Sequence, residues 1–178
     1  MARQAGKRLV IDACVAQAAG GEDATFPLSK QCRDFLRAVY EICHRLVLTP
    51  EIRDEWKQHS SRFTRKWLRW MDGPRKIDRL GSAIDQQLRD DLEKVAGNRS
   101  DADNMLKDVH LIEAALATDQ TVVSWEKRSR KLFAAAAARL ASLGSIVWVD
   151  PSIQSEDTIA WLKEGAKPEN HRKLADLS

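Results

Sequence analysis

Four short apolar runs in the chain have the length of buried β-strands. They lie at residues 8–15, 45–49, 120–125 and 146–149. The first run is apolar on both of the faces that a strand presents, as expected for a central parallel strand that is covered on each side. We therefore predict that these runs are the strands of one sheet.

The segments between these runs carry apolar residues three and four positions apart, which is the period of an amphipathic helix. Helices are predicted from Ser29, from Pro50, from Ser100 and around the alanines at 134–138. Ser100 is interpreted as the cap of its helix, with Asp103 as its partner in a capping box. Strands that alternate with helices predict an α/β fold with a mainly parallel central sheet flanked by helices.

The segment 50–96 has a helical pattern throughout. Its first apolar stripe ends at Gly73-Pro74, and a second stripe recurs from Ile77 to Val95. We therefore predict a pair of long antiparallel helices in 50–96. This pair is a candidate for dimerisation, for substrate binding or for docking of a partner, and the pattern does not choose among the three.

The chain length of 178 residues suits one domain with its own core. We predict that this domain covers residues 1–150 and that residues 151–178 form a tail. The tail has one short amphipathic stretch around Trp161, and its polar end at 168–173 is expected to be mobile.

The composition indicates a globular protein, because 43% of the residues are hydrophobic and 31% are charged. The net charge of +3 is too small to indicate nucleic acid by itself, but Lys and Arg crowd into 53–79 and 127–139. The basic start and the apolar run after it superficially resemble a secretion signal. Asp12 interrupts that run far short of the roughly 7–15 apolar residues that a signal needs. No run reaches the roughly 18 apolar residues of a membrane span.

We therefore expect a cytoplasmic protein with no membrane partner. The cysteines are odd in number and lack metal-type spacing, so we expect reduced thiols. They are Cys14, Cys32 and Cys43.

Four acids occupy settings that suggest chemistry. Asp12 closes the first apolar run, and Glu55, Asp108 and Glu126 recur near strand ends or helix starts. In an open α/β sheet, ligands collect at the carboxyl ends of the strands. Carboxylates gathered there repel one another by roughly 3 kcal/mol per pair at about 5 Å and an effective dielectric near 20. Such a cluster favours a bound hard cation, Mg²⁺ or Mn²⁺, as its partner.

The order of these acids resembles the PIN domain family, the metal-dependent ribonuclease fold shared by VapC-type toxins and RNA-processing nucleases. The resemblance spans roughly residues 7–150. It rests on the segments 9–12, 47–56, 107–115 and 122–126, with support from 148–151.

The resemblance implies hydrolysis of RNA phosphodiester bonds by a water that Mg²⁺ or Mn²⁺ activates. It implies that Asp12 and Asp108 are the main metal ligands, and that Glu55 and Glu126 complete the shell or orient the water. Because the family includes toxins, an antitoxin protein is a candidate partner beside RNA, and a homodimer is a further one.

Two positions depart from the family pattern. Glu126 stands where the family has Asp, and Ala13-Cys14 stands where small hydroxyl or amide side chains often follow the first acid. The second departure predicts the loss of a hydrogen bond that supports the site. Two alternatives therefore stay open: a catalytically weak PIN-like module that binds RNA or a protein partner, and a plain α/β domain whose acids do not converge.

The remaining candidates are weaker. The four histidines lack zinc spacing, and His110 is expected to face away from Asp108, because two helical residues differ by about 200°. Asp119 is assigned to a turn. Trp56, Trp67 and Trp70 have helical spacing and are interpreted as core residues rather than as a stacking surface. The basic residues beside them are either a solvated face or an RNA track; they are Arg53, Lys57, Arg62, Arg65, Lys66 and Arg69.

Overall fold

The computed structural model describes residues 6–177 and has a five-stranded sheet at its centre. Every strand pair is parallel, and the strand order is β3-β2-β1-β4-β5. The strands are β1 (Arg8–Ile11), β2 (Arg45–Leu48), β3 (Ile77–Arg79), β4 (Thr121–Val123) and β5 (Val147–Val149). This is the α/β fold with a parallel central sheet that the sequence predicts.

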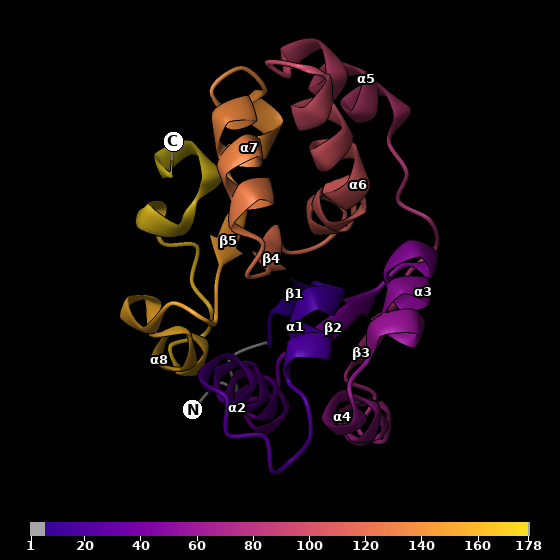
Figure 1. Ribbon diagram of the computed structural model, residues 1–178, viewed down its shortest axis with the longest axis vertical. Helices are drawn as coiled ribbons and strands as arrows, with labels where there is room; N and C mark the ends of the chain where they lie inside the picture. The colour runs from indigo at the N-terminus through magenta and orange to yellow at the C-terminus, as the bar shows by residue number, and fades with distance from the viewer. Residues whose placement is uncertain (1–5, 178) are drawn as a thin grey trace.

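Helices cover both faces of the sheet, as Figure 1 shows. One layer contains α1 to α4, which contact one another, and the other contains α5 to α7. The helices are α1 (Ala13–Ala18), α2 (Pro27–Glu41), α3 (Pro50–His59), α4 (Arg62–Asp72), α5 (Gln86–Val95), α6 (Arg99–Leu116), α7 (Lys127–Ala137) and α8 (Thr158–Lys163). Because the chain winds from β1 to β3 on one side and then returns to β4 on the other, the winding direction reverses between β1 and β4.

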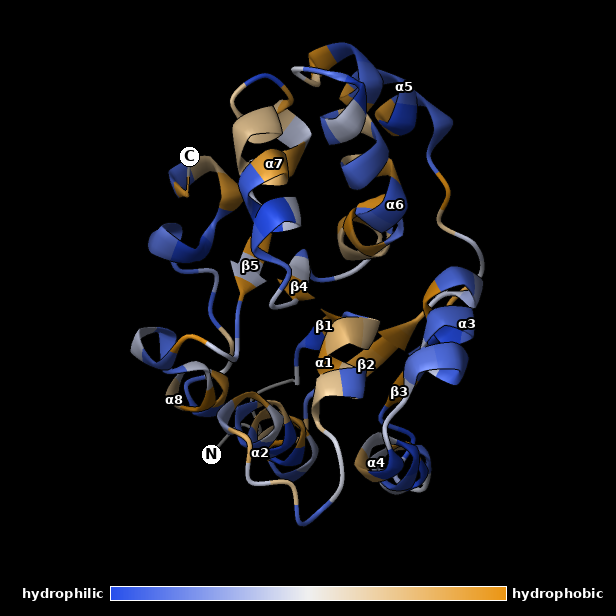
Figure 2. Cartoon of the chain, viewed as in Figure 1, coloured by the Kyte–Doolittle hydropathy of each residue, from blue (hydrophilic) through white to orange (hydrophobic). Residues whose placement is uncertain are grey.

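The core lies on both faces of the strands, which are among the most hydrophobic parts of Figure 2. Trp56 and Trp67 are buried, as predicted, and their indole N–H groups donate to Ile11 O (2.9 Å) and Leu36 O (2.6 Å). Trp70 is half-buried. Trp56 therefore ties α3 to β1, and Trp67 ties α4 to α2. The basic residues of α3 and α4 are exposed.

The first strand is shorter than predicted. It ends at Ile11, and α1 begins at Ala13. The reason is Asp12, whose side chain accepts the Cys14 N–H and caps the new helix. The apolar residues 13–16 therefore belong to a helix, which a short continuous apolar run cannot distinguish from a strand.

The predicted helical pair in 50–96 is wrong, because this segment contains three helices and a strand. Ser61 caps α4 and separates it from α3, and Asp85 caps α5. The residues 77–79 pair with β2 in parallel, with Leu46 opposite Ile77. Hydrogen bonds offered by the open side of β2 thus override the helical spacing of the first apolar residues in that stripe.

The start of one further helix differs from the prediction. The helix α6 begins at Arg99 and is capped by Asn98, which accepts the Asp101 N–H at 2.9 Å, so Ser100 is not the cap. Asp103 instead pairs with Arg99 at 2.9 Å.

The end of the chain packs on the sheet rather than being loose as predicted. Val147 of β5 forms an antiparallel bridge with Lys173. Arg172 is buried, and its guanidinium donates to Glu156 O and to Glu169 Oε2, both at 2.6 Å. None of the helices within residues 6–177 is long and apolar enough to cross a membrane.

Candidate active site

The carboxyl edge of the sheet, where β1 and β4 lie side by side, is the point at which the winding reverses. This is where open α/β sheets bind ligands. The Asp12 N–H donates to Val123 O at 2.9 Å, which ties the ends of the two strands together. Asp12 follows β1 directly, and Glu126 follows β4 and precedes α7. Two of the predicted acids are therefore brought together by the sheet itself.

All four predicted acids line one hollow of about 200 Å³ at this edge. Glu55 reaches it from α3 and Asp108 from α6, so the four acids come from four separate elements. Among residues 6–177, however, no three Asp, Glu, His or Cys side chains are grouped so that they could hold one metal ion as they lie. Binding of an ion would therefore require the carboxylates to rotate toward a common point.

Asp12 is held by neutral donors. Its Oδ2 accepts the Ser124 hydroxyl at 2.7 Å and the Cys14 thiol at 3.1 Å, and its Oδ1 accepts the Cys14 N–H at 3.1 Å. Burial, followed by the charge of Asp12, raises the pKa of the Cys14 thiol, so that the thiol stays protonated and can donate. The predicted loss of a hydrogen bond at this position is therefore wrong: cysteine supplies it.

Asp108 and Glu126 carry charge that the fold does not neutralise. Asp108 is buried and accepts the hydroxyl of Ser129. Burial raises the pKa of Asp108, and the charge of Asp12 adds to that rise, against the hydrogen bond from Ser129. Burial also raises the pKa of Glu126, and the charges of Asp12 and Asp108 act in the same direction.

Glu55 has a histidine partner. His110 Nε2 lies 3.0 Å from Glu55 Oε2, so the residue that was expected to face away from Asp108 contacts another of the four acids. Burial works to lower the pKa of His110, but Glu55, Asp12 and Asp108 together raise it. The helix α6 contacts both α3 and α7, so residues that point to opposite sides of it both reach the edge of the sheet.

The supporting residues differ in how visible they are in the sequence. Ser124 stands two residues before Glu126 at a strand end, which is a usable signal for a side chain that faces the same edge. Ser129, His110 and the thiol of Cys14 have no such signal, because their bonds to the acids depend on tertiary packing.

The donor set suits a hard divalent cation by its chemistry. Carboxylate oxygens are the ligands that Mg²⁺ and Mn²⁺ prefer. Within the described part of the chain, none of the four acids forms a salt bridge with a Lys or an Arg, and Glu55 pairs only with His110. Lys107 also lines the hollow and lowers the pKa values of Asp108 and Glu126, but it does not outweigh the effects that raise them.

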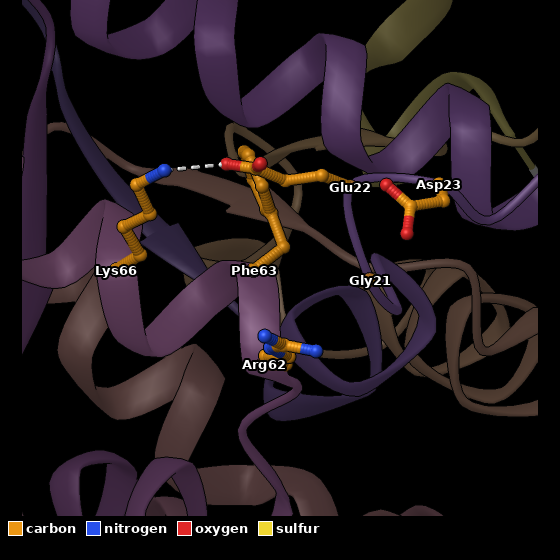
Figure 3. A pocket seen from close by; sticks show the side chains of 6 residues that line it. All are labelled: Gly21, Glu22, Asp23, Arg62, Phe63 and Lys66. Carbon is orange, nitrogen blue, oxygen red and sulfur yellow. Dashed lines mark hydrogen bonds and ion pairs between the residues drawn. The ribbon is translucent and has the colours of Figure 1, made fainter.

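A second hollow, of about 190 Å³, lies between residues 21–23 and the start of α4 (Figure 3). Lys66 crosses it to donate to Glu22 Oε1 at 2.7 Å. Lys66 and Arg62 are the cations that line it, and Glu22 and Asp23 bring acids to the same place. The charges in this hollow balance one another, in contrast to those at the edge of the sheet.

The fold and the site define the class of the protein. It is an all-parallel α/β protein with an acidic hollow at the carboxyl ends of β1 and β4, the switch point at which the winding direction reverses. No protein-family model matches the chain, and no curated protein or solved structure matches it either.

Proposed function

We propose that the protein is a metal-dependent ribonuclease of the PIN type that acts in the cytoplasm. Its acids would be Asp12, Glu55, Asp108 and Glu126. One observation carries this proposal: four acids from four elements line one hollow at the switch point of the sheet, and none of them has a Lys or Arg salt-bridge partner in the described chain.

The missing positive charge is the main support for a cation. Buried carboxylates that influence one another's pKa values need a counter-charge or must be partly protonated. Asp12 and Asp108 would be the direct ligands, and Glu55 and Glu126 would complete the shell. When bound, Mg²⁺ or Mn²⁺ lowers the pKa of a water that attacks the phosphodiester and stabilises the negative charge that develops.

The surrounding residues orient the acids. A carboxylate can accept about four hydrogen bonds. Asp12 accepts three and keeps room for a ligand, and the bonds from Ser129 and His110 fix Asp108 and Glu55 in the same way. All of these partners donate to a carboxylate oxygen.

Substrate binding is attributed to exposed cations on the helix that carries Glu55 and on the helix that follows it. Arg53 and Lys57 are exposed on α3, the helix that carries Glu55, and α4 continues the basic surface. Such residues bind the phosphate backbone and release its counterions. RNA is therefore the proposed substrate. An antitoxin partner and a homodimer stay predictions from the family resemblance.

The substitution Asp12→Asn tests the activity. We expect it to slow RNA cleavage in Mn²⁺ by more than about 100-fold, because even residues that only support metal ligands are worth 10- to 100-fold. The control is Asp54→Asn, which removes an exposed acid next to Glu55 and should leave the rate unchanged. If the Asp12→Asn protein cuts RNA as fast as the wild type, the proposed function is wrong.

A second function is favoured by one observation. Because no three acids within 6–177 are grouped for one ion, the protein is alternatively a PIN-like module without activity that binds RNA or a protein partner. Calorimetric titration with Mn²⁺ separates the two functions. Heat of binding that disappears in Asp12→Asn supports the nuclease, and no heat in the wild type supports the binding module.

A further inference from the structure

A larger hollow, of about 700 Å³, opens beside the acidic one, between the starts of α2 and α7. Phe26, Trp125, Lys127 and Arg128 are among the residues that line it, and Glu126 lines both this hollow and the acidic hollow. The volume lies in the range of sites that hold small organic ligands. It combines two aromatic rings with two cations.

We propose that this hollow binds one unpaired nucleotide of single-stranded RNA, with the base against Phe26 and Trp125 and the phosphates near Lys127 and Arg128. This inference rests on the proposed ribonuclease function and names the substrate class of the same site. Because Glu126 borders both hollows, a nucleotide bound here lies next to the phosphate that would enter the acidic hollow.

Phe26 is unusual in its exposure. Among the described residues, Phe26 (68% exposed) and Ile84 (54%) are the large apolar side chains that face solvent. The ring is also presented by a rigid backbone, because Pro27 follows as the first residue of α2 and restricts Phe26 to an extended conformation (φ −57°, ψ 132°). A pre-oriented, exposed aromatic ring is suited to stacking on a base.

Trp125 connects the hollow to the acids. It is half-buried, and its indole N–H donates to Cys14 O at 3.0 Å. Cys14 is the residue whose thiol and backbone N–H hold Asp12. The second aromatic wall of the hollow is thus fixed to the turn that carries the first acid of the proposed active site.

The hollow is lined by two cations and one acid, Glu126, so a phosphate would lie on the side of Lys127 and Arg128. Lys127 is exposed and forms no ion pair within residues 6–177, and Arg128 is 55% exposed while it contacts Asp101 at 3.2 Å. The helices α2 and α7 both begin here without a side-chain cap, and the positive ends of their dipoles add to the potential. These groups complement phosphates better than they complement an apolar peptide.

The hollow is suited to an unpaired base rather than to a base in a duplex. In a duplex each base is stacked on its neighbours, and extruding it costs a few kcal/mol. Single strands offer free base faces to aromatic side chains without that cost. We therefore expect single-stranded RNA to bind more tightly than a hairpin of the same length.

The experiment uses Asp12→Asn as the parent protein, so that the RNA stays uncut. The dissociation constants of a labelled single-stranded 10-mer RNA and of a hairpin are measured in Mn²⁺. Addition of Phe26→Ala should weaken binding of the single strand by about 5- to 100-fold, the range found for loss of one base–aromatic stack. Phe26→Trp should retain binding. The control Ile84→Ala removes the other exposed apolar side chain and should have no effect.

Several results would overturn the inference. They are equal affinity of the parent and the Phe26→Ala variant for the single strand, no binding of the single strand at all, and tighter binding of the hairpin. A change in self-association by light scattering without a change in RNA affinity would assign the hollow to a protein partner instead.

The two proposals fail separately. Wild-type protein that does not cut RNA, combined with loss of binding in the Phe26→Ala variant, removes the nuclease and keeps the nucleotide site. Wild-type protein that cuts RNA, combined with unchanged binding in that variant, keeps the nuclease and removes the nucleotide site.

Discussion

Acids at the two ends of the parallel strands differ in how they are paired. At the amino edge, where β1 begins, Arg8 donates to Oδ1 of Asp119 through Nε (3.1 Å) and Nη2 (2.7 Å), and its backbone N–H donates to Oδ2 (2.8 Å). Burial works to raise the pKa of Asp119, but these bonds lower it overall. At the carboxyl edge, Asp108 and Glu126 have raised pKa values and no such partner.

The same contrast exists within one helix. Glu113 of α6 is buried, and Arg89 binds both of its oxygens, with Nε at 2.7 Å and Nη2 at 2.8 Å. Asp108, on the same helix, is also buried, and within residues 6–177 the hydroxyl of Ser129 is its one hydrogen-bond donor. The fold therefore supplies a guanidinium to acids with a structural role and leaves the hollow without one, which is the charge distribution expected of a cation site.

Removing the arginine that pairs with Glu113 should have the largest effect on the unfolding free energy. Arg89→Met leaves the Glu113 carboxylate buried without its counter-charge, which typically costs about 3–5 kcal/mol of unfolding free energy. Lys107→Met at the hollow is the matched control, and an exposed residue of this kind should cost less than about 0.5 kcal/mol. Urea denaturation of both variants measures the difference. Equal losses would mean that the acids of the hollow depend on Lys107 as much as Glu113 depends on Arg89.

Adding Mn²⁺, the proposed counter-charge of the four acids, should have the next largest effect on the unfolding free energy. Mn²⁺ at about 100 times its dissociation constant should add roughly 2.7 kcal/mol to the unfolding free energy of the wild type. Asp119→Asn, at the other edge, should keep this gain, and Asp108→Asn should lose most of it. The measurement is thermal unfolding with and without Mn²⁺. A gain that survives in Asp108→Asn would place the cation somewhere other than in the hollow.

The sequence predicts the apolar strands well and the polar strand poorly. The residues of β1, β2, β4 and β5 are recognisable because they lie in apolar runs, and this holds even for β5, which is an edge strand of three residues. The strand β3 is the other edge strand, and it is not recognisable because two of its three residues, Asp78 and Arg79, are charged. Its hydrogen bonds come from pairing with β2, and local spacing does not encode that pairing.

The candidate site divides in the same way. Asp12 and Glu126 can be found because each follows a strand, so that the topology decides which end of the sheet it joins. Glu55 and Asp108 lie within helices, and the family resemblance points to them. Their partners His110, Ser129 and Cys14 cannot be found so easily. Whether His110 meets Glu55 depends on how α6 lies between α3 and α7, and helical angles within α6 do not contain that information.

The smallest expected effect is on the pH dependence of stability in metal-free protein. It compares two matched substitutions, Asp108→Asn and Asp119→Asn. The pKa of Asp108 is raised above its ordinary value of 3.8, so its charged form destabilises the folded state. This penalty is absent below pH 3.8, grows as the pH rises toward the raised pKa, and is complete above it. The pKa of Asp119 is lowered, so its charged form stabilises the fold above pH 3.8, and that stability is lost as the pH falls through the lowered pKa.

We therefore expect opposite signs from the two substitutions at pH 7. Asp108→Asn should raise the unfolding free energy and Asp119→Asn should lower it, each by on the order of 1 kcal/mol, the size of the interaction between two unit charges about 4 Å apart in water. Both differences should shrink toward acid pH, where the carboxylates of the wild type are themselves protonated. Denaturant unfolding at a series of pH values measures them. A loss of stability in Asp108→Asn at pH 7 would show that this acid serves the fold as Asp119 does, and would remove the reason to expect a cation beside it.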